Sequence, residues 1–243
     1  MTNKTNEPKM LGSRDSHILL RRLVAQEKPG RVLDAGAGPG SLTKFLYERG
    51  FDVRCCDVDP KLYKGPGIPI DKVDLNDKLP YEDSAFDYVT ASNVIHRLYN
   101  VDGAIAEFAR VLKTGGKLFL TFNNYSNISK RVRFLFYGSL TSKTNEGRFV
   151  QTIDIPAARL RQAIFFPQIS KSLERAGLQI EAVKSSRRRF GALLLTPLAL
   201  FIRLVTTILP LHKKESNCLR EMNSWALLPG GKHMAIVASK RKM

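Results

Sequence analysis

The 243-residue sequence contains only three cysteines, and it has no internal repeat and no low-complexity tract. The odd count excludes a disulfide framework that uses all three. Cys55 and Cys56 are neighbours in an apolar run, so their side chains should point to opposite faces of a strand. Residues Met1–Lys9 are polar and do not have the apolar stretch of a signal peptide. We therefore expect free thiols and a reducing, cytoplasmic environment.

Acidic residues are scarce in the second half of the chain. The whole sequence has 39 Lys and Arg against 22 Asp and Glu, a formal net charge of +17. Residues 1–27 carry a net of +2 and residues 28–125 carry 13 charges of each sign, whereas residues 126–243 carry 21 basic and six acidic residues. An excess of this size indicates a polyanionic partner, and it lies almost entirely on one half of the chain.

Short apolar segments alternate with amphipathic ones along the chain. This order predicts parallel βαβ units in an α/β, Rossmann-like, doubly wound sheet. We expect an N-terminal helix within residues 1–27, a main domain of residues 28–185 and 230–243, and an insertion of residues 186–229. Strands are predicted at 31–34, 51–58, 70–75, 86–92, 117–122, 178–184 and 233–239, and helices at 13–26, 41–49, 101–112 and 166–176.

A glycine-rich loop follows the first predicted strand, with Gly36, Gly38 and Gly40 at alternate positions. Glycine is needed where the chain turns with positive φ or where a ligand touches the backbone. The spacing differs from the dinucleotide fingerprint G-x-G-x-x-G, because Ser41 stands where the third glycine would fall. A ligand with an amino-acid end and no pyrophosphate suits it better, and Asp34 would anchor the loop or bind an ammonium group through water. The alternative is a tight strand–helix turn without a ligand.

Acidic residues also end the next two strands. Asp57 lies 21 residues beyond Gly36, where a carboxylate can accept both ribose hydroxyls of a nucleoside. Asp59 could substitute for it, although we expect Asp59 to cap the following turn. Asp74 and Leu75 occupy the place where an acid and an apolar neighbour would hold adenine; the alternative is a loop aspartate.

Together these motifs resemble, in order and spacing, the class I S-adenosylmethionine-dependent methyltransferases. The resemblance covers about residues 28–125 and includes Asp34–Gly40, Asp57, Asp74–Leu75, Leu79–Val89 and Val111–Gly116. Farther along, residues 123–136 and 174–177 resemble the MetW-like branch of that class. The resemblance implies a seven-stranded, mostly parallel sheet with an antiparallel last strand, and S-adenosylmethionine at the carboxyl ends of the first, second and fourth strands. It assigns cofactor binding to Asp34, Gly36, Gly38, Gly40, Asp57, Val58, Asp74, Leu75 and Asn93.

The segment after the fourth strand supplies a candidate general base. Methyl transfer to a hydroxyl is helped by a base, and His96 is placed where family members face the methyl group; the alternative is a structural histidine at a helix start. Residues 92–96 have no proline, unlike enzymes that methylate the amino groups of adenine or glutamine. Cys218 follows Asn217 rather than proline, unlike the nucleophile of cytosine-C5 enzymes. No metal-ligand spacing is present, so we expect no metal.

An apolar run, residues 190–211, lies between basic clusters and contains a single charge, Arg203. Three interpretations are open: a transmembrane span, a buried helical cap over the core, or a segment lying in the interface of an anionic membrane. The predicted topology starts this insertion at the cofactor edge of the sheet, beside the acceptor pocket.

Three functions fit these features. The first is a methyltransferase acting on a small-molecule or lipid-linked acceptor, cytoplasmic and peripheral at the inner membrane face. The second is an RNA methyltransferase that uses the basic half to hold phosphates. The third is a non-catalytic cofactor-binding protein of the same fold. The oligomeric state does not follow from the sequence.

Overall fold

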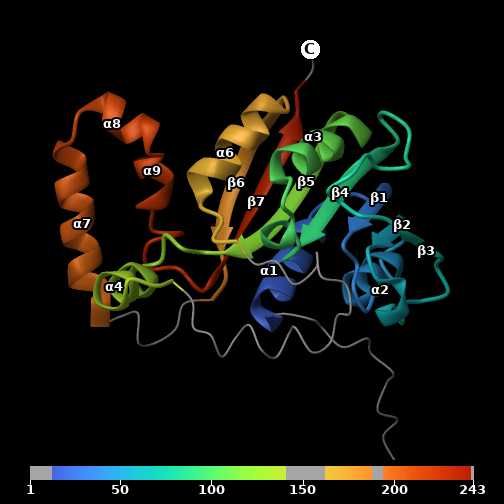
Figure 1. Cartoon of the computed structure of the whole chain (residues 1–243), viewed down its shortest axis with the longest axis horizontal. Coiled ribbons are helices and arrows are strands. Elements are labelled where there is room, and N and C mark those ends of the chain that lie inside the picture. The colour runs from blue at the N-terminus through green and yellow to red at the C-terminus, as the bar shows by residue number, and fades with distance from the viewer. Residues whose placement is uncertain (1–12, 141–161, 188–193, 242–243) are drawn as a thin grey trace, which may run out of the picture.

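A twisted sheet forms the centre of the computed structural model, which describes residues 13–140, 162–187 and 194–241. Its seven strands are β1 (Arg31–Ala35), β2 (Asp52–Asp57), β3 (Ile70–Lys72), β4 (Phe86–Ser92), β5 (Leu112–Asn123), β6 (Leu178–Ser185) and β7 (His233–Lys240). They are arranged in the order β3-β2-β1-β4-β5-β7-β6 (Figure 1). The pairs among β1 to β5 are parallel, and β7 is antiparallel to both β5 and β6. The predicted doubly wound fold with an antiparallel last strand is confirmed.

Helices cover both faces of the sheet. The helices α1 (Arg14–Val24) and α2 (Ser41–Tyr47) pack on one face, and α3 (Val101–Val111) and α6 (Phe166–Arg175) on the other. Two short 3-10 helices, η1 (Pro60–Leu62) and η2 (Ile95–Arg97), lie in the loops that follow β2 and β4. The helix α4 (Ile128–Tyr137) follows β5, and α7 (Thr196–Ile208), α8 (Leu211–Ser216) and α9 (Leu219–Met222) connect β6 to β7.

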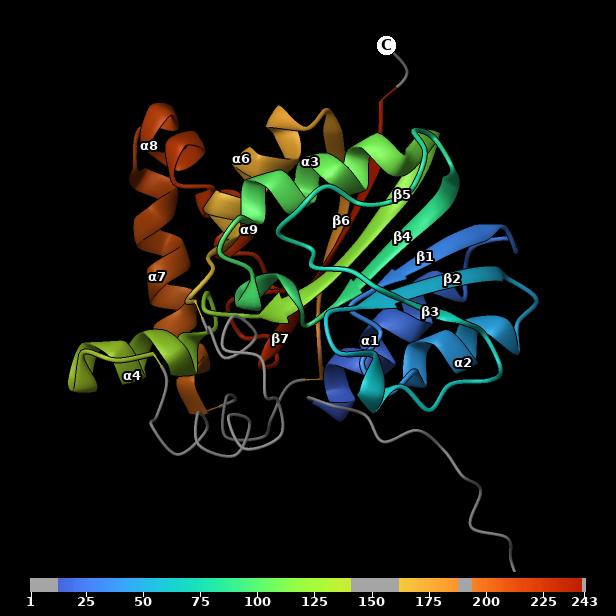
Figure 2. The ribbon, with the colours of Figure 1, turned by 45° about the vertical axis from the view of Figure 1, so that its right-hand side comes forward.

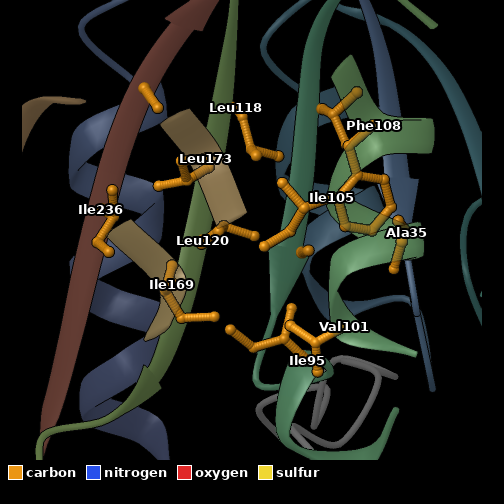
Figure 3. Packing of buried hydrophobic residues seen from close by; sticks show 14 of the residues in the cluster. Ala35, Ile95, Val101, Ile105, Phe108, Leu118, Leu120, Ile169, Leu173 and Ile236 are labelled. Carbon is orange, nitrogen blue, oxygen red and sulfur yellow. The ribbon is translucent and has the colours of Figure 1, made fainter. Parts of the chain in front are cut away.

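The core follows the two-residue period of the strands. Leu118 and Leu120 of β5 belong to the cluster under α3 and α6, whereas Phe119 between them belongs to the cluster under α1 and α2. Figure 3 shows the first cluster, in which β5 and β7 meet the two helices through Leu118, Leu120, Ile236, Ile105, Phe108, Ile169 and Leu173. Because both faces are covered, these strands are almost continuously apolar.

The neighbouring cysteines of β2 are buried and free, as predicted. Burial raises the pKa of Cys55 to about 11 and that of Cys56 to about 12. The thiols therefore stay protonated at neutral pH, and they act as small apolar side chains in the sheet.

Two predicted strand boundaries are wrong. β5 begins at Leu112 rather than at residue 117, because Leu112 already pairs with Phe86 of β4. The register shifts before the next pair, Tyr88 with Lys117, and Gly115 lies in this irregular part of the strand with φ +79°. β3 ends at Lys72 rather than at residue 75, because a turn closes at Asp74, whose carbonyl accepts from the Asp77 amide at 3.1 Å. Asp74 and Leu75 therefore lie in the loop after β3.

The insertion between β6 and β7 differs from a buried cap. Ala199 is the single buried residue of α7, so the buried-cap interpretation is wrong for this helix. Within the described residues, no helix combines the length and the apolar character needed to cross a membrane. The remainder of the apolar run, residues 190–193, lies outside the described residues, as do the N-terminal residues 1–12.

Candidate functional site

The glycine loop turns from β1 into α2 at the point where the strand order reverses. β1 has β2 on one side and β4 on the other, and ligands of open α/β sheets bind outside the carboxyl ends of the strands at such a point. Gly40 precedes α2 with φ +87°, and a Cβ there would lie 2.7 Å from the Tyr63 ring and 2.9 Å from the Gly65 Cα. At Gly36, with φ +76°, a Cβ would lie 2.7 Å from Val94. Glycine is therefore required at both positions by conformation and by space.

The Asp57 carboxylate at the end of β2 lies against this loop. Its Oδ2 accepts from the Gly38 amide at 2.8 Å, and its Oδ1 accepts from the Asp59 amide at 3.0 Å. Burial raises the pKa of Asp57, and the two backbone donors act in the opposite direction. The two oxygens are thus oriented by backbone groups, and their remaining lone pairs can accept from a ligand's hydroxyl groups. Val58, the next residue, is half-buried.

The Asp34 carboxylate lies beneath the loop and is 1% exposed. It accepts from the Thr43 hydroxyl of α2 at 2.7 Å and from the Thr90 hydroxyl of β4 at 3.0 Å. Burial raises the pKa of Asp34 to about 6, even though both hydroxyls act to lower it. Of the two predicted roles, the observed contacts are those of a loop anchor, which joins the first turn of α2 to β4.

Asp74 and Leu75 connect the loop after β3 to the loop after β4. The Asp74 Oδ1 accepts from the backbone amide and the side-chain amide of Asn76, at 2.9 and 2.7 Å. The Asn76 Oδ1 in turn accepts from the Tyr99 and Asn100 amides at 2.9 and 3.1 Å. Leu75 is buried. Asp74 therefore holds the relative position of two loops at the carboxyl edge.

Asn93 and His96 follow β4 at the same edge. Asn93 has φ +55°, its amide donates to the Thr121 carbonyl, and its side chain donates to the Ser16 hydroxyl of α1 at 2.5 Å. His96 lies on η2, is half-buried, and its carbonyl accepts from the Gln162 amide at 2.8 Å. The structure thus brings Asn93 against the N-terminal helix, a contact that the sequence did not predict.

Two further histidines lie at this edge and were not predicted. His233 begins β7 and pairs with Asn123 at the end of β5, because the antiparallel strand brings its amino end to the carboxyl edge. Burial lowers the pKa of His233 to about 4, and Lys232, Lys130 and the nearby His17 of α1 add to the effect. His233 is therefore neutral at pH 7. A histidine at the start of an antiparallel last strand was the signal that could have identified it.

Metal-binding groups of three or more His, Cys, Asp or Glu side chains are not found among the described residues. The described site consists of a glycine loop, oriented carboxylates and histidines, arranged along the carboxyl ends of β1, β2, β4 and β5.

Comparison with known proteins finds similarity to methyltransferases. Residues 33–120 match the family model described as a methyltransferase domain. An uncharacterized methyltransferase of Mycobacterium tuberculosis is 37% identical over 97 residues, 38% of this chain and 40% of that protein. A demethylmenaquinone methyltransferase of Thermobifida fusca is 30% identical over 117 residues, 44% of this chain and 49% of that protein. The matched segment therefore spans less than half of either relative.

Among solved structures, the chain is similar to the 1,6-didemethyltoxoflavin-N1-methyltransferase of Burkholderia thailandensis, with a TM-score of 0.52 at 13% identity. The similarity covers 94% of this chain and 78% of that one. That crystal structure contains 1,6-didemethyltoxoflavin and S-adenosylhomocysteine. The fold, the glycine loop at its switch point and the methyltransferase-domain match over residues 33–120 together support a class I S-adenosylmethionine-dependent methyltransferase.

Proposed function

We propose that this protein transfers a methyl group from S-adenosylmethionine to a small-molecule or lipid-linked acceptor at the cytoplasmic face of a membrane. The observation that carries the proposal is the Asp57 carboxylate, hydrogen-bonded to the Gly38 amide of the glycine loop at the switch point of the sheet. The arrangement supports the proposal because a carboxyl group, which can accept from two hydroxyls, lies directly beside a loop with glycine at three of its positions.

The residues at the carboxyl edge fit S-adenosylmethionine. The half-buried backbone of Gly36 and Gly38 is the proposed contact for the amino-acid end, and the Asp57 carboxyl group is the proposed acceptor for the ribose. We also assign cofactor binding to Asp74, Leu75, Val58 and Asn93, of which Asp74 supplies a hydrogen-bond acceptor for adenine. Asp34 supports the loop from below through Thr43 and Thr90 rather than by direct contact.

When bound, the cofactor supplies an electrophilic methyl group on a sulfonium. The chain aligns the acceptor with that group and excludes water from the site. His96 on η2 is the proposed general base for a hydroxyl acceptor, and the neutral His233 at the other side of the edge is the second candidate.

An apolar acceptor is supported by the insertion and by the relatives. The outward face of α7 is apolar, and the Thermobifida fusca relative is named for demethylmenaquinone. We therefore propose an acceptor with a large apolar part. The basic excess after residue 125 favours an anionic surface near it.

The test is calorimetric titration of the purified chain with S-adenosylmethionine and S-adenosylhomocysteine. Asp57→Ala should lower the affinity at least about tenfold, because a charged acceptor of two hydrogen bonds is lost. Asp52→Ala, at the exposed start of the same strand, is the matched control and should bind as the parent does. Failure of the parent chain to bind either compound would refute the proposal.

To identify the acceptor, the chain is incubated with methyl-labelled S-adenosylmethionine together with an extract of cells. Polar and lipid extracts are tested in separate incubations. Label entering the lipid extract is the expected result. Label entering RNA instead would refute the proposed acceptor class and leave the methyl transfer itself intact.

A further inference from the structure

The helix α7 has its apolar side chains on the outside. Leu198, Phe201, Val205 and Ile208 recur at helical spacing and are 39 to 80% exposed. The opposite side faces the protein through Ala199, Ile202, Arg203 and Thr206, where the Arg203 guanidinium donates to the Asn223 carbonyl at 2.7 Å and lies over the Trp225 ring. An amphipathic helix of a water-soluble domain normally has the reverse arrangement.

The helix α4 shows the same feature at its far end. The consecutive residues Phe134, Leu135, Phe136 and Tyr137 are 54 to 78% exposed. The near end is held by Ile128, which is buried together with Ala199 of α7 and Leu228. In Figures 1 and 2, α4 lies at the foot of α7, at the end of the sheet to which the arrowhead of β5 points.

The two helices meet at the buried Ile128 and Ala199, and both carry exposed apolar side chains, which we call the α4–α7 surface. It consists of Phe134, Leu135, Phe136, Tyr137, Leu198, Leu200, Phe201, Leu204, Val205 and Ile208. Leu194, just before α7, and Leu211, at the start of α8, are exposed as well. Together with them, the α4–α7 surface holds twelve of the sixteen exposed large apolar side chains of the described residues. Single exposed apolar side chains scattered over a surface are ordinary. Exposed apolar side chains concentrated on two contacting helices instead indicate an interaction site.

The charges on these helices decide between possible partners. Helices α4, α7 and α8 carry six basic residues and one acidic residue, Glu215. Four of the six basic side chains donate to backbone carbonyls of the protein, namely Lys130, Arg131, Arg203 and Lys214. Lys213 is exposed, and the half-buried Arg133 lies over the Tyr137 ring. A second copy of this chain would bring like charges together. A bilayer that contains anionic phospholipid offers opposite charge and an apolar interior at once.

We propose that the α4–α7 surface docks on a bilayer containing anionic phospholipid, with the aromatic end of α4 and the outer face of α7 entering the lipid. Because four residues separate the end of β5 from the start of α4, docking brings the carboxyl edge of the sheet close to the lipid. The role of docking in delivering a lipid-linked acceptor rests on the proposed function; the docking itself does not.

The experiment is co-sedimentation of the full chain with vesicles at low salt. One set of vesicles contains phosphatidylcholine alone, and the other contains phosphatidylcholine mixed with phosphatidylglycerol. The chain should bind the anionic vesicles, should bind the neutral ones more weakly, and should be released by salt. Phe136→Ser and Phe201→Ser should each weaken binding about tenfold, because each removes one exposed aromatic group that enters the lipid on docking. Tyr47→Ser, an exposed aromatic on α2, is the matched control and should bind normally.

Three results would overturn the proposal: no binding to anionic vesicles, unchanged binding of both phenylalanine variants, or RNA binding that competes fully with vesicles. A dimer in the parent chain that both variants dissociate, without vesicle binding, would assign the surface to a second copy instead. Calorimetry with S-adenosylhomocysteine on the same samples separates the two proposals. Vesicle binding without cofactor binding refutes the proposed methyl transfer and leaves the docking intact. Cofactor binding without vesicle binding refutes the docking and the proposed membrane location, and leaves the methyl transfer intact.

Discussion

Replacement of the buried Asp34 by asparagine should remove a loss of stability that the parent protein undergoes as the pH rises toward neutrality. The carboxylate is 1% exposed and its pKa is raised to about 6 by burial, whereas an aspartate of the unfolded chain has a pKa of ~3.9. Between these values the folded protein binds more protons than the unfolded chain, so its stability falls as the pH rises. Ionisation of Asp34 therefore costs about 3 kcal/mol above about pH 7, and this cost is absent below about pH 4.

Asparagine has the same shape and no charge. Its carbonyl can accept from one of the two threonine hydroxyls, and its amide can donate to the other. Any change in the free energy of unfolding that comes from the amide group itself, rather than from loss of the titrating carboxyl, is independent of pH. The stability of Asp34→Asn relative to the parent should therefore rise by about 1 kcal/mol between about pH 5 and about pH 7 and then level off.

The measurement is urea-induced unfolding of both proteins at several fixed pH values. Asp87→Asn is the control: although burial acts to raise its pKa, the hydrogen bond from Lys113 lowers the pKa of Asp87. Its difference from the parent should be constant over the same interval, since both folded and unfolded carboxyls are already ionised there. A pH-independent difference for Asp34→Asn would refute the raised pKa and with it the description of Asp34 as a buried anchor.

Two further predictions concern the loop and the base. Gly40→Ala should cost about 1–3 kcal/mol in unfolding free energy and weaken cofactor binding, because its Cβ would meet Tyr63 and Gly65; Gly50→Ala, with similar φ and open space around it, should cost less. Equal losses in the two variants would show that contact with Tyr63 does not matter. His96→Ala should lower turnover with unchanged cofactor affinity, and the same assay on His233→Ala decides which histidine is the base. His212→Ala, on the exposed α8, serves as the control, and full activity of both site variants would exclude a histidine base.

Much of the sheet and its glycine loop could be predicted from the sequence, because both depend on local patterns. The apolar strands, the helix periodicity and the three glycines after residue 35 determine the βαβ units without reference to distant residues. The acidic residue after the second strand follows from the same register. The contact of Asp57 with the Gly38 amide shows that these local features meet at one point, as the order of the strands requires.

Tertiary structure decided what depends on pairs of segments far apart in the chain. The sequence could not show that the Asp34 carboxylate accepts from Thr43 and Thr90, which lie 9 and 56 positions farther along the chain. Nor could it place His233 beside His17, because that requires the antiparallel last strand.

The apolar run of the insertion shows the same division. Its composition determined that residues 190–211 would be apolar and flanked by cations, and left three interpretations open. Only the packing of α7 through Ala199 and Arg203 showed which side faces the protein and which side is exposed. Hydrophobicity is a property of the residue and can be seen in the sequence, whereas burial is a property of its neighbours and is settled only when the chain has folded.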